Sequence, residues 1–220
     1  MGERWATFDC YGTLVDWNAG IRGELERLFG AAQVDRLLER YHELERQVQA
    51  EDSARSYREV LTLTLERLAD DEGLAIPEGE AGALARSLPD WPVFPEVPAA
   101  LEKARGRGWR LCILSNSDRD LIDASIAAIG TSFDDSIVAS EIGSYKPAHG
   151  HWREFERRHG ALPDVHVAAS LFHDVGPARD LGLPSVWINR LGEDGGEPRP
   201  TRELSDLGPL PEVLDELVPA

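Results

Sequence analysis

The stretch Thr7-Phe8-Asp9-Cys10-Tyr11-Gly12-Thr13-Leu14-Val15-Asp16 decides the fold of this chain. The run from Trp5 to Phe8 predicts a buried strand, which ends at an acid and a turn that contains Gly12. Open α/β sheets place their active sites at the carboxyl ends of parallel strands, where Asp9 would lie. A carboxylate there can attack an electrophile and form an ester that water later cleaves, so Asp9 is a candidate nucleophile. Tyr11, two residues further on, is not a second acid, and this bears on the reaction.

Short apolar strands alternate with amphipathic helices along the chain, which predicts a parallel sheet flanked by helices, an α/β fold. The expected strands are Trp5–Phe8, Arg110–Leu114, Ser136–Ala139, His166–Ala169 and Ser185–Ile188. Helices are expected at Leu121–Ile129 and Pro211–Leu217, and the Gly- and Pro-rich segment from Gly192 to Thr201 is expected to be a loop.

A long segment between the first two strands has helical periodicity and no convincing strand. Its apolar residues recur at three- and four-residue steps in three groups, within residues 21–29, 37–48 and 60–68. Ser53 is expected to cap the third of these helices, and the Pro-dense stretch Leu88–Pro98 is expected to be extended. We therefore predict a helical cap at residues 16–92, return linker included, inserted into a core formed by residues 1–15 and 93–220.

The formal net charge of −17 argues against nucleic acid or an anionic membrane surface as a partner. No apolar run approaches the roughly 20 residues that span a bilayer, and no secretory signal is visible at the N-terminus. Cys10 and Cys112 are the only cysteines and lie in or beside expected strands, which indicates reduced thiols. These features predict a cytoplasmic protein.

Three further strand ends carry polar side chains that could meet Asp9. The second strand runs into Ser115-Asn116-Ser117-Asp118 and then a helix, where backbone N–H groups and the helix dipole favour an anion. Lys146 follows the third strand and could neutralise Asp9, and Asp174 follows the fourth and could hold a metal, anchor Lys146 or position water. The structural alternatives are helix capping by Ser117 or Asp118, a chance loop position for Lys146, and capping of a helix at Val175–Leu181 by Asp174.

The histidines show no spacing typical of a metal site. His149, His151 and His159 are expected at the surface, and His173 is expected to be structural. No metal ligands are predicted among them.

Taken in order, the Asp9 loop, the helical insert, Ser115-Asn116, Lys146-Pro147 and Asp174 resemble the haloacid dehalogenase superfamily, over nearly the whole chain. Within it, Phe8–Asp16 and the run Gly182–Arg190 are similar to the 2-haloacid dehalogenases of type II. The resemblance implies a Rossmann-like core of parallel strands with a helical cap over their carboxyl ends. It also implies a small-molecule substrate, and a homodimer is one expected assembly.

The resemblance further implies a two-step hydrolysis. Asp9 would displace halide from C2 of a short 2-haloacid, and water near Asp174 would hydrolyse the ester. Thr13 and Ser115 would hold carboxylates, and Lys146 would lower the pKa of the nucleophile by proximity. Asn116 would contact the halide with an arginine of the cap, for which Arg40 aligns best, although Arg36 and Arg46 lie near. The alternative for the three arginines is a solvated, salt-bridged helix face.

Tyr11, Ser170 and Trp152 complete the expected substrate-binding set, and the chain departs from the family pattern beside two of them. Typical haloacid dehalogenases have two serines and an Asn shortly before the final Asp, where this chain reads Ala169-Ser170-Leu171. Trp152 stands where an active-site Tyr is expected. Leu171 cannot hydrogen-bond water, which puts the substrate in question.

Phosphatases of the superfamily carry a second Asp where this chain has Tyr11. That acid protonates a leaving oxygen, whereas a halide leaving carbon needs no proton and no Mg²⁺. We therefore expect no cofactor. Three alternatives stay open: a Mg²⁺-dependent small-molecule phosphatase, a hydrolase of another carbon–heteroatom bond (C–F or strained C–N), and a binding protein that keeps the fold without catalysis.

Overall fold

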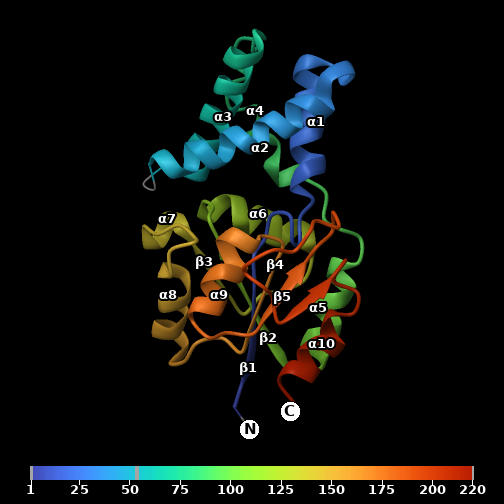
Figure 1. The fold of residues 1–220 in the computed structure, drawn as a ribbon, viewed down its shortest axis with the longest axis vertical. Helices are drawn as coiled ribbons and strands as arrows, with labels where there is room; N and C mark the ends of the chain where they lie inside the picture. The colour runs from blue at the N-terminus through green and yellow to red at the C-terminus, as the bar shows by residue number, and fades with distance from the viewer. Residues whose placement is uncertain (1, 53–54, 220) are drawn as a thin grey trace. The chain divides into compact units, whose positions relative to one another are not determined.

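The computed structural model describes residues 2–52 and 55–219 of the chain (Figure 1). The chain divides into two compact units, one formed by Met1–Val15 with Val93–Ala220 and the other by Asp16–Pro92. In the described residues, no helix combines the length and the apolar character needed to cross a membrane.

The first unit is built on a six-stranded sheet of order β3-β2-β1-β4-β5-β6, in which every neighbouring pair is parallel. The strands are β1 (Arg4–Phe8), β2 (Trp109–Ser115), β3 (Asp135–Val138), β4 (Val165–Ala168), β5 (Ser185–Ile188) and β6 (Arg202–Leu204). Their connections include α5 (Val97–Gly106), α6 (Arg119–Ile129), α7 (Ala139–Ile142), α8 (Gly150–His159) and α9 (Gly176–Asp180), and α10 (Leu210–Leu217) ends the unit. The predicted α/β fold with a parallel sheet is confirmed.

The strand predictions are correct to within one residue at each end. Two of them ran one residue too far, because Ala139 begins α7 and Ala169 follows the last residue of β4. Strand β6 was missed, since its three residues are mostly exposed and too short to show a period. It pairs with β5 at the edge of the sheet.

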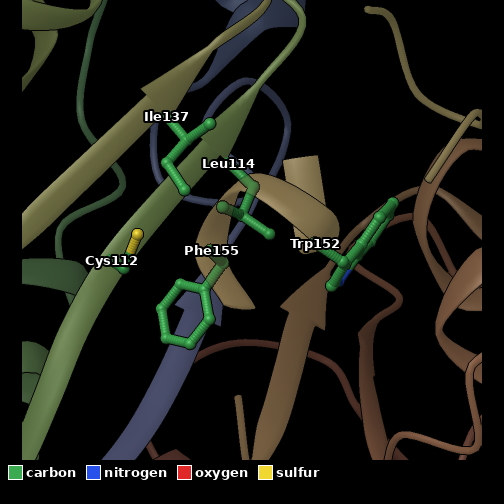
Figure 2. Close-up of a cluster of buried hydrophobic side chains, with 5 residues drawn as sticks. All are labelled: Cys112, Leu114, Ile137, Trp152 and Phe155. Carbon is green, nitrogen blue, oxygen red and sulfur yellow. The ribbon is translucent and has the colours of Figure 1, made fainter. Parts of the chain in front are cut away.

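One face of the sheet is packed by α8, as Figure 2 shows. Alternate residues of β2, Cys112 and Leu114, point to the same face because side chains alternate along a strand. They meet Trp152 and Phe155 of α8 and Ile137 of β3, all fully or almost fully buried. This packing fixes α8 against the strands whose carboxyl ends carry the polar residues.

The second unit contains α1 (Trp17–Phe29), α2 (Val34–Glu51), α3 (Tyr57–Glu72) and α4 (Ala83–Ser87), with short 3₁₀ turns at Ala31–Gln33 and Leu88–Asp90. Helix α3 begins at a capping box, in which Ser56 accepts from the Glu59 backbone and the Glu59 side chain accepts from Ser56. Ser53, the expected cap, lies outside the described residues. The expected extended linker is interrupted by the Leu88–Asp90 turn and ends where α5 begins.

Close packing within this unit explains why a glycine stands in α1. A Cβ at Gly20 would overlap the indole ring of Trp91, which is itself buried. Since the clash involves a rigid ring, Gly20 allows the segment before Pro92 to lie against α1.

A carboxylate lies buried between α2 and α3. Glu45 is 4% exposed and accepts a hydrogen bond from Tyr57 Oη at 3.2 Å. Burial raises the pKa of Glu45 from 4.5 to about 7, against the opposing effect of the bonds from Tyr57 and Gln49. The stabilising contribution of a group with a raised folded-state pKa is fully present below the unfolded value of 4.5, and it is lost as the pH rises through about 7.

Replacement of Glu45 by Gln should therefore stabilise the protein selectively at alkaline pH. A tenfold change in an equilibrium is worth about 1.4 kcal/mol, and the pKa of Glu45 rises from 4.5 to about 7. We therefore expect Glu45→Gln to increase the free energy of unfolding by about 3 kcal/mol at pH 8.5 and by less than about 1 kcal/mol at pH 5. Urea denaturation at both values measures this. Glu39→Gln, an exposed acid on the same helix, is the control. An equal effect of Glu45→Gln at both values would contradict the prediction.

Candidate active site

The loop after β1 places Asp9 at the carboxyl end of the strand. The Asp9 backbone N–H continues the sheet by donating to Val167 O at 3.0 Å, and the chain then turns so that Leu14 and Val15 N–H both donate to Cys10 O. Gly12 adopts a φ of +82°, and a Cβ built there would lie 3.7 Å from Cβ of Ala169. The turn therefore needs glycine for its conformation, and it returns the chain beside the end of β4.

Both carboxylate oxygens of Asp9 are held by buried donors. Lys146 Nζ lies 2.8 Å from Oδ1, and Thr13 Oγ1 lies 3.2 Å from Oδ2. Thr13 Oγ1 also accepts from Ala169 N–H at 2.9 Å, so its one hydroxyl hydrogen is directed at Asp9. Thr13 is fully buried, whereas the Asp9 side chain remains 14% exposed. The carboxylate is thus fixed in orientation with one side open.

Lys146 joins three strand ends through one ammonium group. Its Nζ donates to Asp9 Oδ1 at 2.8 Å, to Leu114 O at 2.8 Å and to Asp174 Oδ1 at 2.6 Å. These three bonds use all the hydrogens that an ammonium group can donate. A planar guanidinium could not converge on three acceptors in this way, which explains why a lysine stands here in a chain whose other basic residues are nearly all arginine.

The three charged groups shift one another's pKa values. Burial raises the pKa of Asp9 and the negative charge of Asp174 adds to this effect, while Lys146 opposes it. Burial also works to raise the pKa of Asp174, but Lys146 and His166 outweigh it and the pKa falls well below its usual range. Burial works to lower the pKa of Lys146, but Asp174 and Asp9 outweigh it and the pKa rises. Asp174 and Lys146 are therefore a lasting ion pair, and Asp9 is the more basic carboxylate.

Asn116 holds the Lys146 loop in place. Its Oδ1 accepts from Lys146 N–H at 2.6 Å, and its Nδ2 donates to Lys146 O at 2.9 Å. The side chain thus binds both backbone groups of the lysine, a contact that the sequence did not predict. The expected contact of Asn116 with a halide stays a prediction. The expected hold of Ser115 on a carboxylate stays one too, and Ser115 is buried at the end of β2.

The alternative in which Asp174 caps a helix is wrong. Asp174 is 1% exposed and lies within a π-helical turn, Leu171–Val175, that precedes α9. The residue that caps this turn is Ser170, whose Oγ accepts from His173 N–H at 3.0 Å. The wide turn directs Asp174 inward to Lys146, and the expected contact of Ser170 with substrate stays a prediction.

The expectation that His151 lies at the surface is wrong. His151 is fully buried, and its Nε2 lies 2.9 Å from Ser115 O. Burial, with Lys146 nearby, lowers the pKa of His151 to about 3, so the neutral ring donates to that carbonyl. The four-residue step from His151 to Phe155 on α8 was the signal that could have placed it on the buried face.

A second buried histidine was not predicted as part of the site. His166 of β4 is fully buried, and its Nε2 lies 3.0 Å from Asp174 Oδ1. The sequence reveals it only as a polar residue inside an apolar strand, a position where a partner is needed because an unpaired polar group is costly to bury.

Three other expected site residues lie in different surroundings. Trp152 is fully buried in the cluster of Figure 2, so its position favours packing rather than contact with substrate. Tyr11 Oη lies 3.2 Å from Ser125 Oγ, and burial raises the pKa of its phenol.

In the helical unit, Arg40 donates to Glu43 at 2.8 Å and to Asp71 at 2.6 Å. These contacts are those of a salt-bridged helix face, the alternative that the sequence left open for Arg40. Binding of a halide by Arg40 stays a prediction.

Comparisons with known proteins identify relatives of this chain and of its fold. A family model described as haloacid dehalogenase-like hydrolase matches residues 4–168. (S)-2-haloacid dehalogenase 4A of Burkholderia cepacia is 27% identical over 227 residues, which cover 98% of this chain and 94% of that protein. Phosphoserine phosphatase of Thermus thermophilus is 31% identical over 132 residues, 58% of this chain and 53% of that protein. The structure of L-2-haloacid dehalogenase from Xanthobacter autotrophicus with chloropropionic acid covalently bound has a TM-score of 0.85 at 19% identity, with 97% of this chain and 98% of that chain covered.

Removal of the ammonium group should destabilise the fold strongly. Lys146→Met keeps the length of the side chain but leaves two buried carboxyl groups without their shared cation, a change that costs about 3–5 kcal/mol. We expect a loss of that size in the free energy of unfolding at pH 7, measured by urea denaturation. Lys103→Met is a matched control, because Lys103 is the only other lysine and its pair with Glu212 is exposed. Its effect should stay below about 1 kcal/mol, and equal losses in the two variants would contradict the prediction.

Proposed function

The chain belongs to the haloacid dehalogenase-like hydrolase family, and on that premise we propose that it hydrolyses the carbon–halogen bond of short 2-haloacids with Asp9 as the nucleophile. The observation that carries the proposal is the hold on Asp9, whose two oxygens are bound by Lys146 and Thr13 at the carboxyl end of β1. A carboxylate that is already fixed in orientation loses little further conformational freedom when it attacks.

The proposed reaction has two steps. An oxygen of Asp9 attacks C2 of the haloacid, a C–O bond forms, and the C–halogen bond breaks with its electron pair leaving on the halide. Water then attacks the carbonyl carbon of the Asp9 ester and restores the carboxylate. The products are a 2-hydroxyacid, a halide ion and a proton.

The electrostatics of the site support Asp9 rather than Asp174 as the nucleophile. The pKa of Asp9 is raised and that of Asp174 is strongly lowered. A more basic carboxylate is a better nucleophile once it is ionised, while the less basic Asp174 serves as the permanent counter-ion of Lys146. Asp9 is also the more exposed of the two.

Tyr11 supports a leaving group that needs no proton. Its phenol is bound to Ser125 and its pKa is raised by burial, so it is a poor acid for a leaving oxygen. A halide departs as a stable anion and needs only a polar surrounding. The matches to an (S)-2-haloacid dehalogenase and to a dehalogenase with chloropropionic acid covalently bound support the same substrate class.

A Mg²⁺-dependent phosphatase is the second candidate, favoured by the match to a phosphoserine phosphatase. The contacts of the two carboxylates support a reaction without that ion instead. Among the residues that the structure describes, no three His, Cys, Asp or Glu side chains gather into a metal-binding group. Asp9 and Asp174 are already bridged by the ammonium of Lys146, which supplies the positive charge that a cation would bring. We therefore propose a reaction without a metal cofactor.

Incubation with 2-chloropropionate should release chloride at the same rate with and without EDTA. Asp9→Asn should abolish release, because an amide cannot displace the halide. Mass spectrometry of the wild-type enzyme stopped during turnover should find the substrate acid, less its halogen, attached to Asp9. EDTA-sensitive hydrolysis of a phosphate ester, with no halide released from a panel of haloacids, would instead establish the phosphatase.

As the pH is lowered, halide release should be lost at a higher pH than it would be if the nucleophile were an aspartate with an unshifted pKa. The first step needs ionised Asp9, and its pKa is raised above 3.8, so protonation removes the nucleophile before a free carboxyl would be protonated. A pH profile of kcat/KM measures the acid limb. A profile that stays flat down to pH 4 would contradict this assignment.

A further inference from the structure

We propose that His166 is a positioning residue of this reaction, one that holds Asp174 and through it the ammonium of Lys146. The inference rests on the proposed function, because it assigns a role in the chemistry of Asp9. His166 lies in the middle of the sheet and touches none of the reacting atoms.

The imidazole is bonded at both nitrogens. Nε2 lies 3.0 Å from Asp174 Oδ1, and Nδ1 lies 2.9 Å from Thr7 Oγ1. Thr7 Oγ1 in turn lies 3.3 Å from Val165 O. Thr7 and His166 are both fully buried. A continuous row of hydrogen bonds therefore runs from the Val165 carbonyl to Asp174 and on to Lys146 and Asp9.

The row fixes the proton on Nε2. Asp174 is ionised, because its pKa lies well below the usual range, so a 3.0 Å contact to Oδ1 requires a donor. If the Thr7 hydroxyl donates to Nδ1, the imidazole is neutral with its hydrogen on Nε2. If the hydroxyl donates to Val165 O, Nδ1 carries a hydrogen as well and the ring is an imidazolium. In both cases Nε2–H donates to Asp174.

Two donors meet on one oxygen of Asp174. Lys146 Nζ approaches Oδ1 at 2.6 Å, the same oxygen that His166 approaches. In the portion of the chain that the structure describes, neither donor binds Oδ2. With Oδ1 fixed from two directions, the carboxylate cannot rotate without breaking a bond. Rotation would draw Lys146 away from Asp9, since one ammonium group serves both carboxylates.

The packing around His166 prevents the ring from moving. Thr7 pairs with Cys112 on one side and with His166 on the other in the sheet, so the three residues point to the same face. On that face the Trp152 ring of α8 meets the imidazole edge-on, with the ring centroids 5.2 Å apart. Trp152 is therefore connected with the site through His166 and not through contact with substrate.

The role becomes most important once Asp9 has been esterified. An ester carries no charge, so Lys146 then keeps one anionic partner, Asp174, besides the Leu114 carbonyl. The bond from His166 keeps this partner in place and leaves Lys146 next to the ester that water attacks. Loss of the imidazole should slow the attack by Asp9 and the hydrolysis of its ester, with little effect on substrate binding.

The test compares His166→Leu, His166→Gln and Thr7→Val with His159→Gln as a control. Gln can place an N–H donor near the position of Nε2, whereas Leu has no donor. His159 makes a similar contact, with Nε2 2.9 Å from Asp135, but at the amino end of the sheet. Chloride release from 2-chloropropionate gives kcat and KM for each variant, and far-UV circular dichroism checks the fold.

A misplacement of about 1 Å can cost up to about 100-fold in rate. We expect His166→Leu to lower kcat by about that factor with KM changed less than about threefold, and His166→Gln to recover most of the loss. Thr7→Val, which removes one hydroxyl and nearly preserves shape, should lower kcat in the same direction by a smaller factor. If His166→Leu does not fold, Thr7→Val and His166→Gln still decide the matter. His159→Gln should leave both constants unchanged.

Normal kcat in folded His166→Leu, or in Thr7→Val where His166→Leu does not fold, would overturn the inference and leave the proposed function intact. A rise in KM at constant kcat, or an equal loss in His159→Gln, would overturn it also. Absence of chloride release by the wild-type enzyme would instead overturn the proposed function, on which the inference rests. The two failures are therefore distinguished by the wild-type protein alone.

Discussion

The ammonium of Lys146, bound to Asp9, Asp174 and the Leu114 carbonyl, is the interaction on which the rest of the site depends. Two carboxyl groups buried this close together could not both stay ionised without a cation between them. Lys146 provides that cation and pairs with both carboxyl groups. The pKa of Asp174 is lowered and that of Asp9 is raised, so the two carboxyl groups differ in basicity although they share one cation. The proposed roles of counter-ion and nucleophile need such a difference.

The parallel sheet makes such a convergence possible. Asp9, Leu114 and Asp174 come from parts of the chain more than 50 residues apart. Asp9 follows β1, Leu114 lies in β2 and Asp174 lies in the segment after β4, and these three strands are neighbours in the sheet. Asn116 adds a fourth connection by binding both backbone groups of Lys146. The sheet therefore brings the polar groups together, and hydrogen bonds among the side chains at the carboxyl ends of its strands set the orientation of these groups.

The sequence predicted the residues whose position follows from strand ends, and it failed where burial depends on the far side of an element. Asp9, Lys146 and Asp174 each follow an apolar strand, and the rule about the carboxyl ends of parallel strands is enough to group them. His151 and Trp152 lie on α8, a mostly polar helix in which only their spacing to Phe155 marks the buried face. His166 was missed because its partners lie on other elements, Thr7 in β1 and Asp174 in the turn after β4. The contact of Arg40 with Asp71 likewise depends on how α2 lies against α3, whereas its pair with Glu43 lies within α2.

The complete use of the hydrogens on Lys146 has a consequence for how enzymes of this kind diversify. A lysine with no free N–H cannot also recognise a substrate. In the proposed reaction, the group that prepares Asp9 is therefore independent of the groups that select the substrate. Substitutions elsewhere can then change which substrate is bound while the contacts of Lys146 with Asp9 and Asp174 stay intact. Leu171, which replaces a polar residue of the typical pattern beside an intact Asp174, is the kind of change that such a division of labour permits.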